Sequence, residues 1–591
     1  MWQFVKNTLS TIVGLFLFSI LAILILVGVG TVMSNSDEHV DLKENSILKI
    51  NLDRPMVENA STEENPLADL AGPFVDNSEK VGLIQILSAL ERAKVDSKIK
   101  GIQLEATLPF AGYSQLSEVR EALEDFKKSG KFILSYADSY TEKGYYVASV
   151  ADEVYLNPNG LLDFNGIAAN YTFFKKALDK LEIEPLIFRV GQYKSAVEPF
   201  IRENMSDENK EQTISFLNSI NNFVFDKIAR SRSLTVPKLN QIADSLSAYS
   251  SNNAAKLGMV KLAYQDEYQA VLMKKMKVKE VKDLVYISLN DYLKAENPIK
   301  EVEGNAKIAV LVAEGEIVGT KGGEGSIGSE SFIKELRKLR DNKSVKAIVL
   351  RIDSPGGSSL ASDNMWREIQ LAKKVKPIIA SMSTYAASGG YYMAMGTDQI
   401  VAHPTTITGS IGIFAQWLNL DKFLSNKLGI THDHVNTNAH SNFMTTPGEL
   451  SDFEKQLVQK FVDEGYESFT SKAAAGRKMS IQKLKSVAGG RVWTGAQAKQ
   501  IGLVDELGGL NTAIALAAKK VNLKAGTFKV TVYPKAKSFI ESFLESATSD
   551  AKISDRILQK HVPWASSIME INRIKQREGL QALMPYMIEL N

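Results

Sequence analysis

The amino-acid sequence predicts an α/β protein in which two tandem copies of one α/β unit follow a single N-terminal transmembrane helix. Three observations support this prediction: an apolar run near the amino terminus, short motifs that recur at a constant spacing, and strand and helix patterns that alternate inside each copy. The 591 residues are enough for several domain-sized hydrophobic cores.

Composition and charge exclude several classes of protein. The chain is 44% hydrophobic and 23% charged, which is typical of globular proteins and excludes a disordered chain or a many-span membrane protein. Its 70 basic and 68 acidic residues leave a net charge of +2, too small to indicate a nucleic-acid partner. Because the chain contains no cysteine, any covalent catalyst must use oxygen or nitrogen.

The apolar run extends from Ile12 to Val32, and no charged residue occurs from Asn7 to Ser36. A helix of this length spans a bilayer. Lys6 precedes the run and acidic residues follow it, so the positive-inside rule favours a cytoplasmic amino end. We therefore expect residues 1–44 to be an uncleaved anchor in the cytoplasmic (inner) membrane, with the body on the periplasmic side. A cleaved signal peptide is the alternative.

Landmarks of the chain recur 246 residues apart. Lys100–Leu104 aligns with Lys346–Leu350, and Gly144–Tyr146 aligns with Gly390–Tyr392. The same shift pairs Asp152, Pro158 and Gly166 with Asp398, Pro404 and Gly412. This duplication predicts a first repeat over residues 45–304 and a second over residues 305–591.

Strand and helix patterns alternate within the repeats. Residues 346–352 and 377–382 are short apolar runs with β-branched residues, and we expect them to be buried strands. Helical spacing precedes the first strand at Ile333, Leu336 and Leu339, and in the first repeat at Leu87, Leu90 and Ala93.

Polar and glycine-rich segments predict helix starts and a loop. Ser451 followed by Glu454 predicts a capping box at the start of a later helix, and Ser206 is expected to begin its counterpart in the first repeat. Residues 320–330 form a glycine-rich loop without the Gly-Lys-Ser/Thr end of a phosphate loop, so we predict no nucleotide site there.

A candidate nucleophile, Ser388, follows the strand at residues 377–382 and lies between small residues where the next helix is expected to begin. The amide of Gly389 and the positive helix end could stabilise an oxyanion there. A second donor could come from Gly356 or Gly357, which follow the neighbouring strand. The alternative is that these glycines serve only close packing.

A nucleophilic serine needs a general base. The chain has six histidines, none in an obvious triad context: His39, His403, His432, His434, His440 and His561. The pair His432 and His434 could bind a metal, but no third ligand lies nearby, and a solvated loop is the simpler interpretation. The other possible base is a lysine whose pKa is lowered by burial. Lys194 lies among apolar and aromatic residues, although from sequence alone it could be any surface lysine.

Four segments together resemble the signal peptide peptidase A family in its long, double-repeat bacterial form. They are Tyr193–Phe200, Ser354–Gly357, Ala386–Tyr391 and Thr408–Gly412, and the resemblance covers nearly the whole chain. It implies that each repeat is a unit like those of crotonases and Clp proteases, that the catalyst is a Ser-Lys dyad, and that the protein is a homo-oligomer, a tetramer.

The resemblance also implies a role for each matching residue. Ser388 would be the nucleophile, Lys194 the general base, and Ser410 a hydroxyl that orients the lysine. One departure from the family is the segment Ser383–Tyr385, where relatives are often glycine-rich.

The duplication supports this division independently. Subtracting 246 from Ser388 gives Glu142, so the first repeat has no serine at the nucleophile position. Adding 246 to Lys194 gives His440, so the second repeat has no lysine at the base position. We therefore expect the first repeat to contribute the general base and the second repeat the nucleophile.

The function predicted is that of a membrane-anchored serine endopeptidase that degrades cleaved signal peptides and similar hydrophobic peptides on the outer side of the cytoplasmic membrane. The expected partners are peptides, the membrane and further copies of the chain, with no nucleic acid, no cofactor and no metal. Two alternatives stay open: an acyl-CoA enzyme of the same fold, and a membrane scaffold without activity. Coenzyme A is cytoplasmic, which argues against the first.

Overall fold

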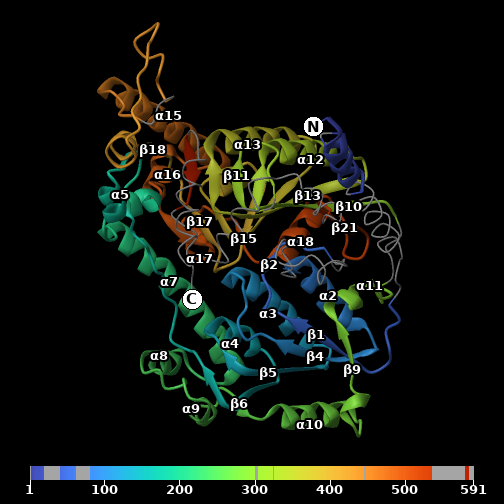
Figure 1. Ribbon diagram of the computed structural model, residues 1–591. Helices are drawn as coiled ribbons and strands as arrows, with labels where there is room; N and C mark the ends of the chain where they lie inside the picture. Colours follow the sequence, from blue (N-terminus) through green and yellow to red (C-terminus); the bar gives the residue numbers. More distant parts are fainter. Residues whose placement is uncertain are drawn as a thin grey trace.

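Two α/β layers form the body of the protein, with the first repeat below the second in Figure 1. This computed structural model describes residues 2–4, 6–18, 40–61, 80–299, 304–323, 325–444, 448–535 and 580–584. We refer to residues 45–304 as the first half and to residues 305–591 as the second half.

The first half is built on a six-stranded sheet in the order β8-β6-β5-β4-β1-β9. Its strands pair in parallel, and parallel neighbours need crossover connections, which the helices provide. Its strands are β1 (Ser46–Asn51), β4 (Ile99–Glu105), β5 (Phe132–Tyr140), β6 (Glu153–Leu162), β8 (Lys261–Leu262) and β9 (Val285–Ser288). Its helices are α2 (Leu83–Val95), α3 (Tyr113–Lys127), α4 (Glu142–Ala148), α5 (Lys175–Leu181), α6 (Glu198–Ile201), α7 (Asp207–Arg232), α8 (Val236–Asp244), α9 (Ser251–Lys256), α10 (Gln265–Met276) and α11 (Leu289–Lys294). A two-stranded sheet pairs β2 (Met56–Val57) with β3 (Val81–Gly82).

The second half is built on an eight-stranded sheet that contains the path β19-β17-β15-β13-β10-β21, with β16 beside β15 and β20. Its strands are β10 (Lys307–Glu314), β13 (Val345–Ser354), β15 (Ile378–Ala387), β16 (Gln399–Ala402), β17 (Ile407–Gly409), β19 (Val492–Thr494), β20 (Glu506–Leu507) and β21 (Lys529–Tyr533). Its helices are α12 (Ser329–Asp341), α13 (Ser359–Lys373), α14 (Gly389–Ala394), α15 (Asp452–Arg477), α16 (Ile481–Val487), α17 (Gly495–Gln500) and α18 (Leu510–Lys520).

The two sheets confirm the predicted duplication of an α/β unit. The neighbours β5-β4-β1 correspond in order to β15-β13-β10. The helices α7 and α15 are each 26 residues long, and the side chains of Ser206 and Ser451 accept hydrogen bonds from the third helical amides, as predicted. Glu454 completes the capping box at the start of α15. The predicted strand at 346–352 is part of β13, and the one predicted at 377–382 is the start of β15, which begins one residue later, at Ile378.

A third sheet joins the two halves. Its order is β12 (Ser326–Gly328), β11 (Glu316–Val318), β14 (Gly356–Ser358), β22 (Gln581–Leu583), β18 (Phe414–Asn419) and β7 (Glu184–Arg189). The strand β7 belongs to the first half, yet it pairs antiparallel with β18 of the second half along all six residues. In Figure 1, α7 begins near α5 at the upper left, beside the second half, and runs down that side of the molecule to the first half. The segment between β7 and α7 is therefore held against the second half.

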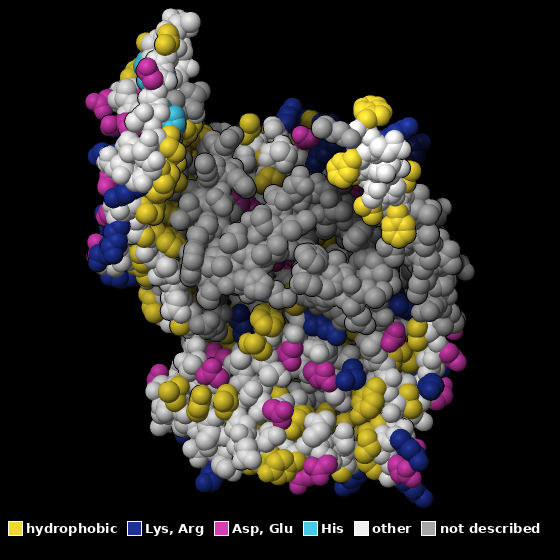
Figure 2. Space-filling view, viewed as in Figure 1, with side chains coloured by type: hydrophobic (Ala, Val, Ile, Leu, Met, Phe, Trp, Pro, Cys, Tyr) yellow, Lys and Arg dark blue, Asp and Glu magenta, His cyan; other side chains and the backbone are white. Residues whose placement is uncertain are grey.

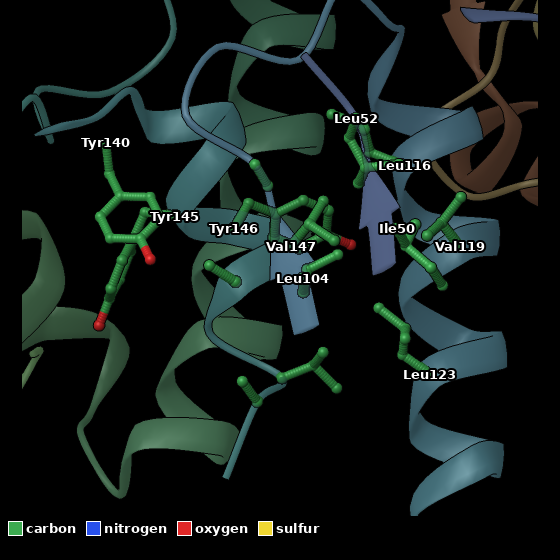
Figure 3. Packing of buried hydrophobic residues seen from close by; sticks show 14 of the residues in the cluster. Ile50, Leu52, Leu104, Leu116, Val119, Leu123, Tyr140, Tyr145, Tyr146 and Val147 are labelled. Carbon is green, nitrogen blue, oxygen red and sulfur yellow. The ribbon is translucent and has the colours of Figure 1, made fainter. Parts of the chain in front are cut away.

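The largest hydrophobic core lies between the first sheet and its helices. Figure 3 shows Ile50 and Leu104 of the sheet facing Leu116, Val119 and Leu123 of α3. The same cluster includes residues of the second half: Ala387, Ile407, Val492 and Met584. The halves therefore share a core, and a separate cluster packs around β13, β15 and α13.

A buried ion cluster also connects the halves. Arg351 in β13 has no exposed surface, and its guanidinium contacts Glu58 and Glu118 of the first half at 2.7 Å each. It also donates to the hydroxyls of Ser381 and Ser383 at 3.0 Å. Because a charge buried at this depth requires partners, the cluster fixes one half against the other.

We expect Glu58→Ala to lower the free energy of unfolding by about 3 kcal/mol, because it removes one of the two carboxylates that neutralise the buried guanidinium. Denaturant unfolding followed by circular dichroism measures this loss. Glu464→Ala is the control, because the ion pair of Glu464 with Lys460 is exposed and should contribute less than about 1 kcal/mol. Equal stabilities of the two variants would contradict a role for the cluster in joining the halves.

The predicted membrane span lies mostly outside the described residues. Residues 6–18 are helical, and the apolar side chains among them are exposed, whereas residues 19–39 are not among those described. Within the described part of the chain, no helix has the length and apolar character needed to cross a bilayer.

Candidate active site

Ser388 lies at the point where β15 passes directly into α14. Its backbone has φ 54° and ψ −110°, a left-handed conformation that is costly for any residue other than glycine. The neighbouring strand holds it there, because the amide of Ser388 donates to the carbonyl of Gly409 at 2.8 Å. The fold thus holds a serine in a strained turn, which is typical of nucleophiles at the end of a sheet strand.

Lys194 lies in the segment after β7, and close backbone approach holds it in place. A Cβ atom on Gly490 would lie 2.6 Å from the Cβ of Lys194, so only glycine fits beside the lysine. The amide of Tyr193 donates to the carbonyl of Gly489 at 3.1 Å, and Arg189 donates to the carbonyl of Lys194 at 3.2 Å. The pairing of β7 with β18 and these contacts therefore hold Lys194 against residues of the second half.

The structure brings Lys194, Ser388 and Ser410 together. The Nζ atom of Lys194 donates to the Oγ atom of Ser388 at 2.9 Å. It also donates to the carbonyl oxygen and the Oγ atom of Ser410, both at 3.1 Å. All three residues are fully buried.

Burial lowers the pKa of the Lys194 ammonium well below its ordinary value of 10.5. Desolvation is the cause, because the oxygen atoms that contact Nζ belong to hydroxyl and carbonyl groups and not to carboxylates. The amine therefore spends more time neutral than an exposed lysine, and a neutral amine can accept a proton from the Ser388 hydroxyl.

Ser410 is the second residue of the site with a left-handed backbone, at φ 49°. It follows β17 directly, and its amide donates to the carbonyl of Arg491 at 2.7 Å. This bond fixes the turn that directs both oxygen atoms of Ser410 at the lysine.

The three glycines predicted as oxyanion donors lie close to one another. The position that a Cβ atom on Gly356 would take is 2.8 Å from the amide nitrogen of Gly389. The amide of Gly356 itself donates to the Oγ atom of Ser354 at 3.2 Å, which leaves Gly357 as the better second donor. The close-packing interpretation also holds in part: a Cβ atom on Gly390 would lie 2.8 Å from the carbonyl oxygen of Ser354.

The residues at the equivalent positions of the other repeat, Glu142 for Ser388 and His440 for Lys194, lie in environments unlike that of the candidate site. Glu142, at the position that corresponds to Ser388, begins α4 and is buried, and burial raises its pKa to about 7. Its carboxylate accepts the amides of Asn165 and Gly166 at 3.1 and 2.7 Å. His440 is exposed and contacts Glu454 at 3.0 Å.

The other described histidines have contacts elsewhere or are exposed. His403 is buried with Thr405 at 2.9 Å and Glu121 at 3.4 Å as its contacts. His432 and His434 are exposed, and no group of three potential metal ligands occurs among the described residues. His39 and His561 lie outside those residues.

Sequence reasoning missed the parts that position the lysine. Gly489 and Gly490 form the surface on which Lys194 lies, and Gln212 of α7 donates to the carbonyl of Tyr193 at 3.1 Å and to the hydroxyl of Ser195 at 3.0 Å. The adjacent glycines before Arg491 are a visible signal of close backbone approach.

Comparisons with known proteins agree with the duplicated architecture. The model of peptidase family S49 matches this chain twice, at residues 125–279 and 370–524. Protease 4 of Haemophilus influenzae is 34% identical over 520 residues, which cover 85% of this chain and 84% of that protein. A protein described as a signal peptide peptidase, SppA, from Enterococcus faecium is 34% identical over 239 residues, which cover 39% of this chain and 69% of that protein.

A solved structure of a ClpP1 mutant from Listeria monocytogenes matches 35% of this chain and 94% of that chain. The TM-score is 0.24 and the sequence identity 15%, a likeness too slight to carry an inference about assembly.

Proposed function

Starting from the premise that this chain is a serine protease and belongs to peptidase family S49, we propose that Ser388 is its nucleophile and Lys194 its general base. The observation that carries the proposal is the 2.9 Å contact between the Ser388 hydroxyl and a fully buried amine. An ordinary surface lysine would be protonated at neutral pH and could not act as a base.

The proposed reaction has two stages. Lys194 takes the proton of Ser388 while Oγ adds to the carbonyl carbon of the peptide bond, and the amides of Gly389 and Gly357 face the developing oxyanion. The C–N bond then breaks, and Lys194 gives its proton to the leaving amine. Water repeats the sequence on the acyl-enzyme: it loses a proton to Lys194, releases the acid product, and the proton returns to Ser388.

We assign Ser410 a positioning role. Its two oxygen atoms accept from the amine and hold Nζ in line with Ser388. No carboxylate contacts Nζ in the described part of the chain, so the amine is oriented without being held in its charged form.

The proposed substrates are signal peptides already released from exported proteins, and similar apolar peptides. The name of the Enterococcus relative supports this class. The amino-terminal helix supports a site near a membrane, because Trp2, Phe4, Leu15 and Phe16 are among its exposed side chains. Figure 2 shows hydrophobic side chains on the surface at the upper right, where this helix lies. In this proposal the helix is the start of an anchor in the cytoplasmic membrane, and the body works on the outer side.

Hydrolysis of a signal-peptide mixture tests the proposed function. The full chain is purified in mild detergent and incubated with synthetic signal peptides, and mass spectrometry identifies the products. We expect internal cleavage of apolar peptides by the wild-type chain and none by Ser388→Ala. Intact peptides in both samples, or equal cleavage by both, would contradict the proposal.

We expect Ser410→Ala to lower kcat about five- to tenfold without abolishing activity, because one hydrogen bond to the amine, worth about 1 kcal/mol, is lost. KM should not change, since Ser410 contacts the amine and not the peptide. A hydroxyl that accepts from the amine favours its protonated form, so the rise of activity with pH should move to lower pH in the variant. A fully active variant with an unchanged pH profile would exclude Ser410 from the site.

A further inference from the structure

A single glutamine side chain joins the segment around Lys194 to the second half. Gln212 lies in α7 and is buried, with 1% of its surface exposed. Its Nε2 atom donates to the carbonyl oxygen of Tyr193 at 3.1 Å and to the Oγ atom of Ser195 at 3.0 Å. Its Oε1 atom accepts from the amide of Val492 in β19 at 3.2 Å. We refer to these three contacts as the Gln212 bridge.

Regular secondary structure gives Lys194 little support of its own. The lysine precedes a 3₁₀ helix of only three residues, Ser195–Val197, and its backbone has φ −78° and ψ 75°, outside the helical and extended regions. The hydrogen bond from its amide to the carbonyl of Gly191 is long, at 3.4 Å. Because regular backbone hydrogen bonds do not fix this segment, side-chain contacts such as the Gln212 bridge determine where the amine lies.

The other end of the bridge holds the strand that fixes the rest of the candidate site. Val492 pairs with Gly409 in the antiparallel ladder of β19 and β17. The carbonyl of Gly409 accepts the amide of Ser388. The carbonyl of Arg491, next to Val492, accepts the amide of Ser410. The bridge therefore connects the segment that carries the candidate base to the strand pair that holds the candidate nucleophile and the hydroxyl beside the amine.

The neighbours of Gln212 fix the orientation of its amide. The Oδ1 atom of Asn209 accepts from Nε2 at 3.1 Å, and the Nδ2 atom of Asn209 donates to Glu198 at 3.1 Å. Glu198 has no exposed surface, so this chain of contacts is sheltered from water. A rotated amide would place Nε2 against the amide of Val492 and Oε1 against the carbonyl of Tyr193. Only the orientation described here therefore satisfies every partner.

The charged side chains near the bridge have partners other than the lysine amine. Glu211, the residue before Gln212 in α7, contacts Arg491 at 2.8 Å and accepts from the hydroxyl of Tyr193 at 2.9 Å. Glu198 accepts hydrogen bonds from the beginning of α7, and Arg189 of β7 donates to the carbonyl of the lysine. The atoms that contact Nζ belong to hydroxyl and carbonyl groups. The bridge thus acts on the amine through its position and not through a charge.

We propose that Gln212 is a positioning residue of the reaction, which holds the segment around Lys194 against β19 and so keeps the amine in line with the Ser388 hydroxyl. This inference rests on the proposed roles of Lys194 and Ser388. Without the bridge, the segment has fewer contacts with the second half, and water reaches the amine more often. A more hydrated amine has a higher pKa, so a smaller fraction of it is neutral at a given pH.

Gln212→Met tests the inference, because methionine keeps the length of the side chain and removes the hydrogen bonds of the amide. In the full chain, purified in detergent and assayed on an apolar peptide, we expect kcat at neutral pH to fall about tenfold. KM should not change, since the bridge contacts groups of the enzyme and not the peptide. The rise of activity with pH should move up by about one pH unit, opposite in direction to the shift expected for Ser410→Ala.

Gln497→Met is the matched control. Gln497 lies in α17, which Figure 1 shows beside α7. Its side chain donates to the hydroxyl of Ser215 in α7 at 2.9 Å and accepts from the amide of Thr494 in β19 at 3.0 Å. These bonds join the same helix to the same strand but involve no residue of the Tyr193–Ser195 segment. We expect a similar loss of thermal stability in both glutamine variants, and the wild-type kcat and pH profile in Gln497→Met alone.

Ser195→Ala provides a second measurement, because it removes one partner of Gln212 and leaves the glutamine amide in place. We expect a smaller change in the same direction, with kcat about threefold lower and the rise of activity displaced toward higher pH. This variant decides the question if Gln212→Met does not fold.

A wild-type kcat and an unchanged pH profile in Gln212→Met, or in Ser195→Ala where the first variant does not fold, would overturn the inference. Equal losses of kcat in Gln212→Met and Gln497→Met would also overturn it, because the effect would then belong to the junction of the halves. In these cases hydrolysis by the wild type and none by Ser388→Ala leaves the proposed function standing. If the wild type hydrolyses no peptide, the proposed function fails and the inference fails with it.

Discussion

Ser388→Ala is expected to abolish peptide hydrolysis while the protein stays folded. Without Oγ no acyl-enzyme can form, so kcat should fall by about 10⁴-fold or more. The hydroxyl is small and its hydrogen bond is to the lysine amine, so the midpoint of thermal unfolding should change little. Initial rates on a fluorogenic apolar peptide, together with a thermal melt of the same sample, measure both effects.

Ser383→Ala is the matched control, since it removes a buried hydroxyl from the same strand, β15. Ser383 contacts Glu58 and accepts from Arg351, so its loss should lower the free energy of unfolding by about 1–2 kcal/mol and leave hydrolysis largely intact. An inactive Ser383→Ala beside an active Ser388→Ala would show that the nucleophile has been assigned to the wrong serine.

Lys194→Arg and Lys194→Met are both expected to be inactive, with kcat lowered about 10⁴-fold or more, and to differ in stability. Guanidinium does not deprotonate in a protein, so arginine keeps the charge but cannot act as a base. It also buries a charge at a position that no carboxylate of the described residues contacts, so the variant should unfold at lower temperature.

The methionine variant should be more stable than the wild type at neutral pH. The pKa of Lys194 is lower in the folded state, so folding releases a proton, and between the folded and unfolded pKa values stability rises with pH. Methionine removes this cost, and the difference in melting temperature from the wild type should shrink as the pH rises toward 10.5. Hydrolysis by the arginine variant at the wild-type rate would exclude Lys194 as the base.

The strand before the candidate nucleophile could be predicted because the signals are local. The apolar run before Ser388 and the small residues around it indicate a strand that ends in a tight turn, and β15 indeed ends at Ala387. The duplication was equally visible, since it depends only on spacing. The domain boundaries at residues 44 and 304 remain predictions.

Lys194 could not be identified from its own surroundings. Its proposed role as a base depends on burial. The lysine is buried because β7 crosses to pair with β18, a contact between segments far apart in the chain. Two observations alone indicated Lys194. One was the resemblance to the signal peptide peptidase A family. The other was the comparison of positions 246 residues apart, which leaves a lysine in one half and a serine in the other.

Two further features could not be predicted from the sequence, because contacts between distant segments define them. Arg351 lies inside an apolar strand, but nothing local in the sequence indicated that Glu58 and Glu118 would pair with it. The strand β22 has three residues, too few for any periodicity, and pairing with β14 and β18 alone defines it.

The pH dependence of kcat/KM tests the central claim most directly, because it reports the ionisation of the free enzyme's base. The wild type, His403→Ala and His440→Ala are compared on one apolar peptide from about pH 5 to about pH 10. If the buried amine of Lys194 is the base, activity rises with pH through one ionisation below 10.5, and the rise is the same in all three proteins. A rate independent of pH, or a rise that disappears in either histidine variant, would contradict the Ser388–Lys194 dyad.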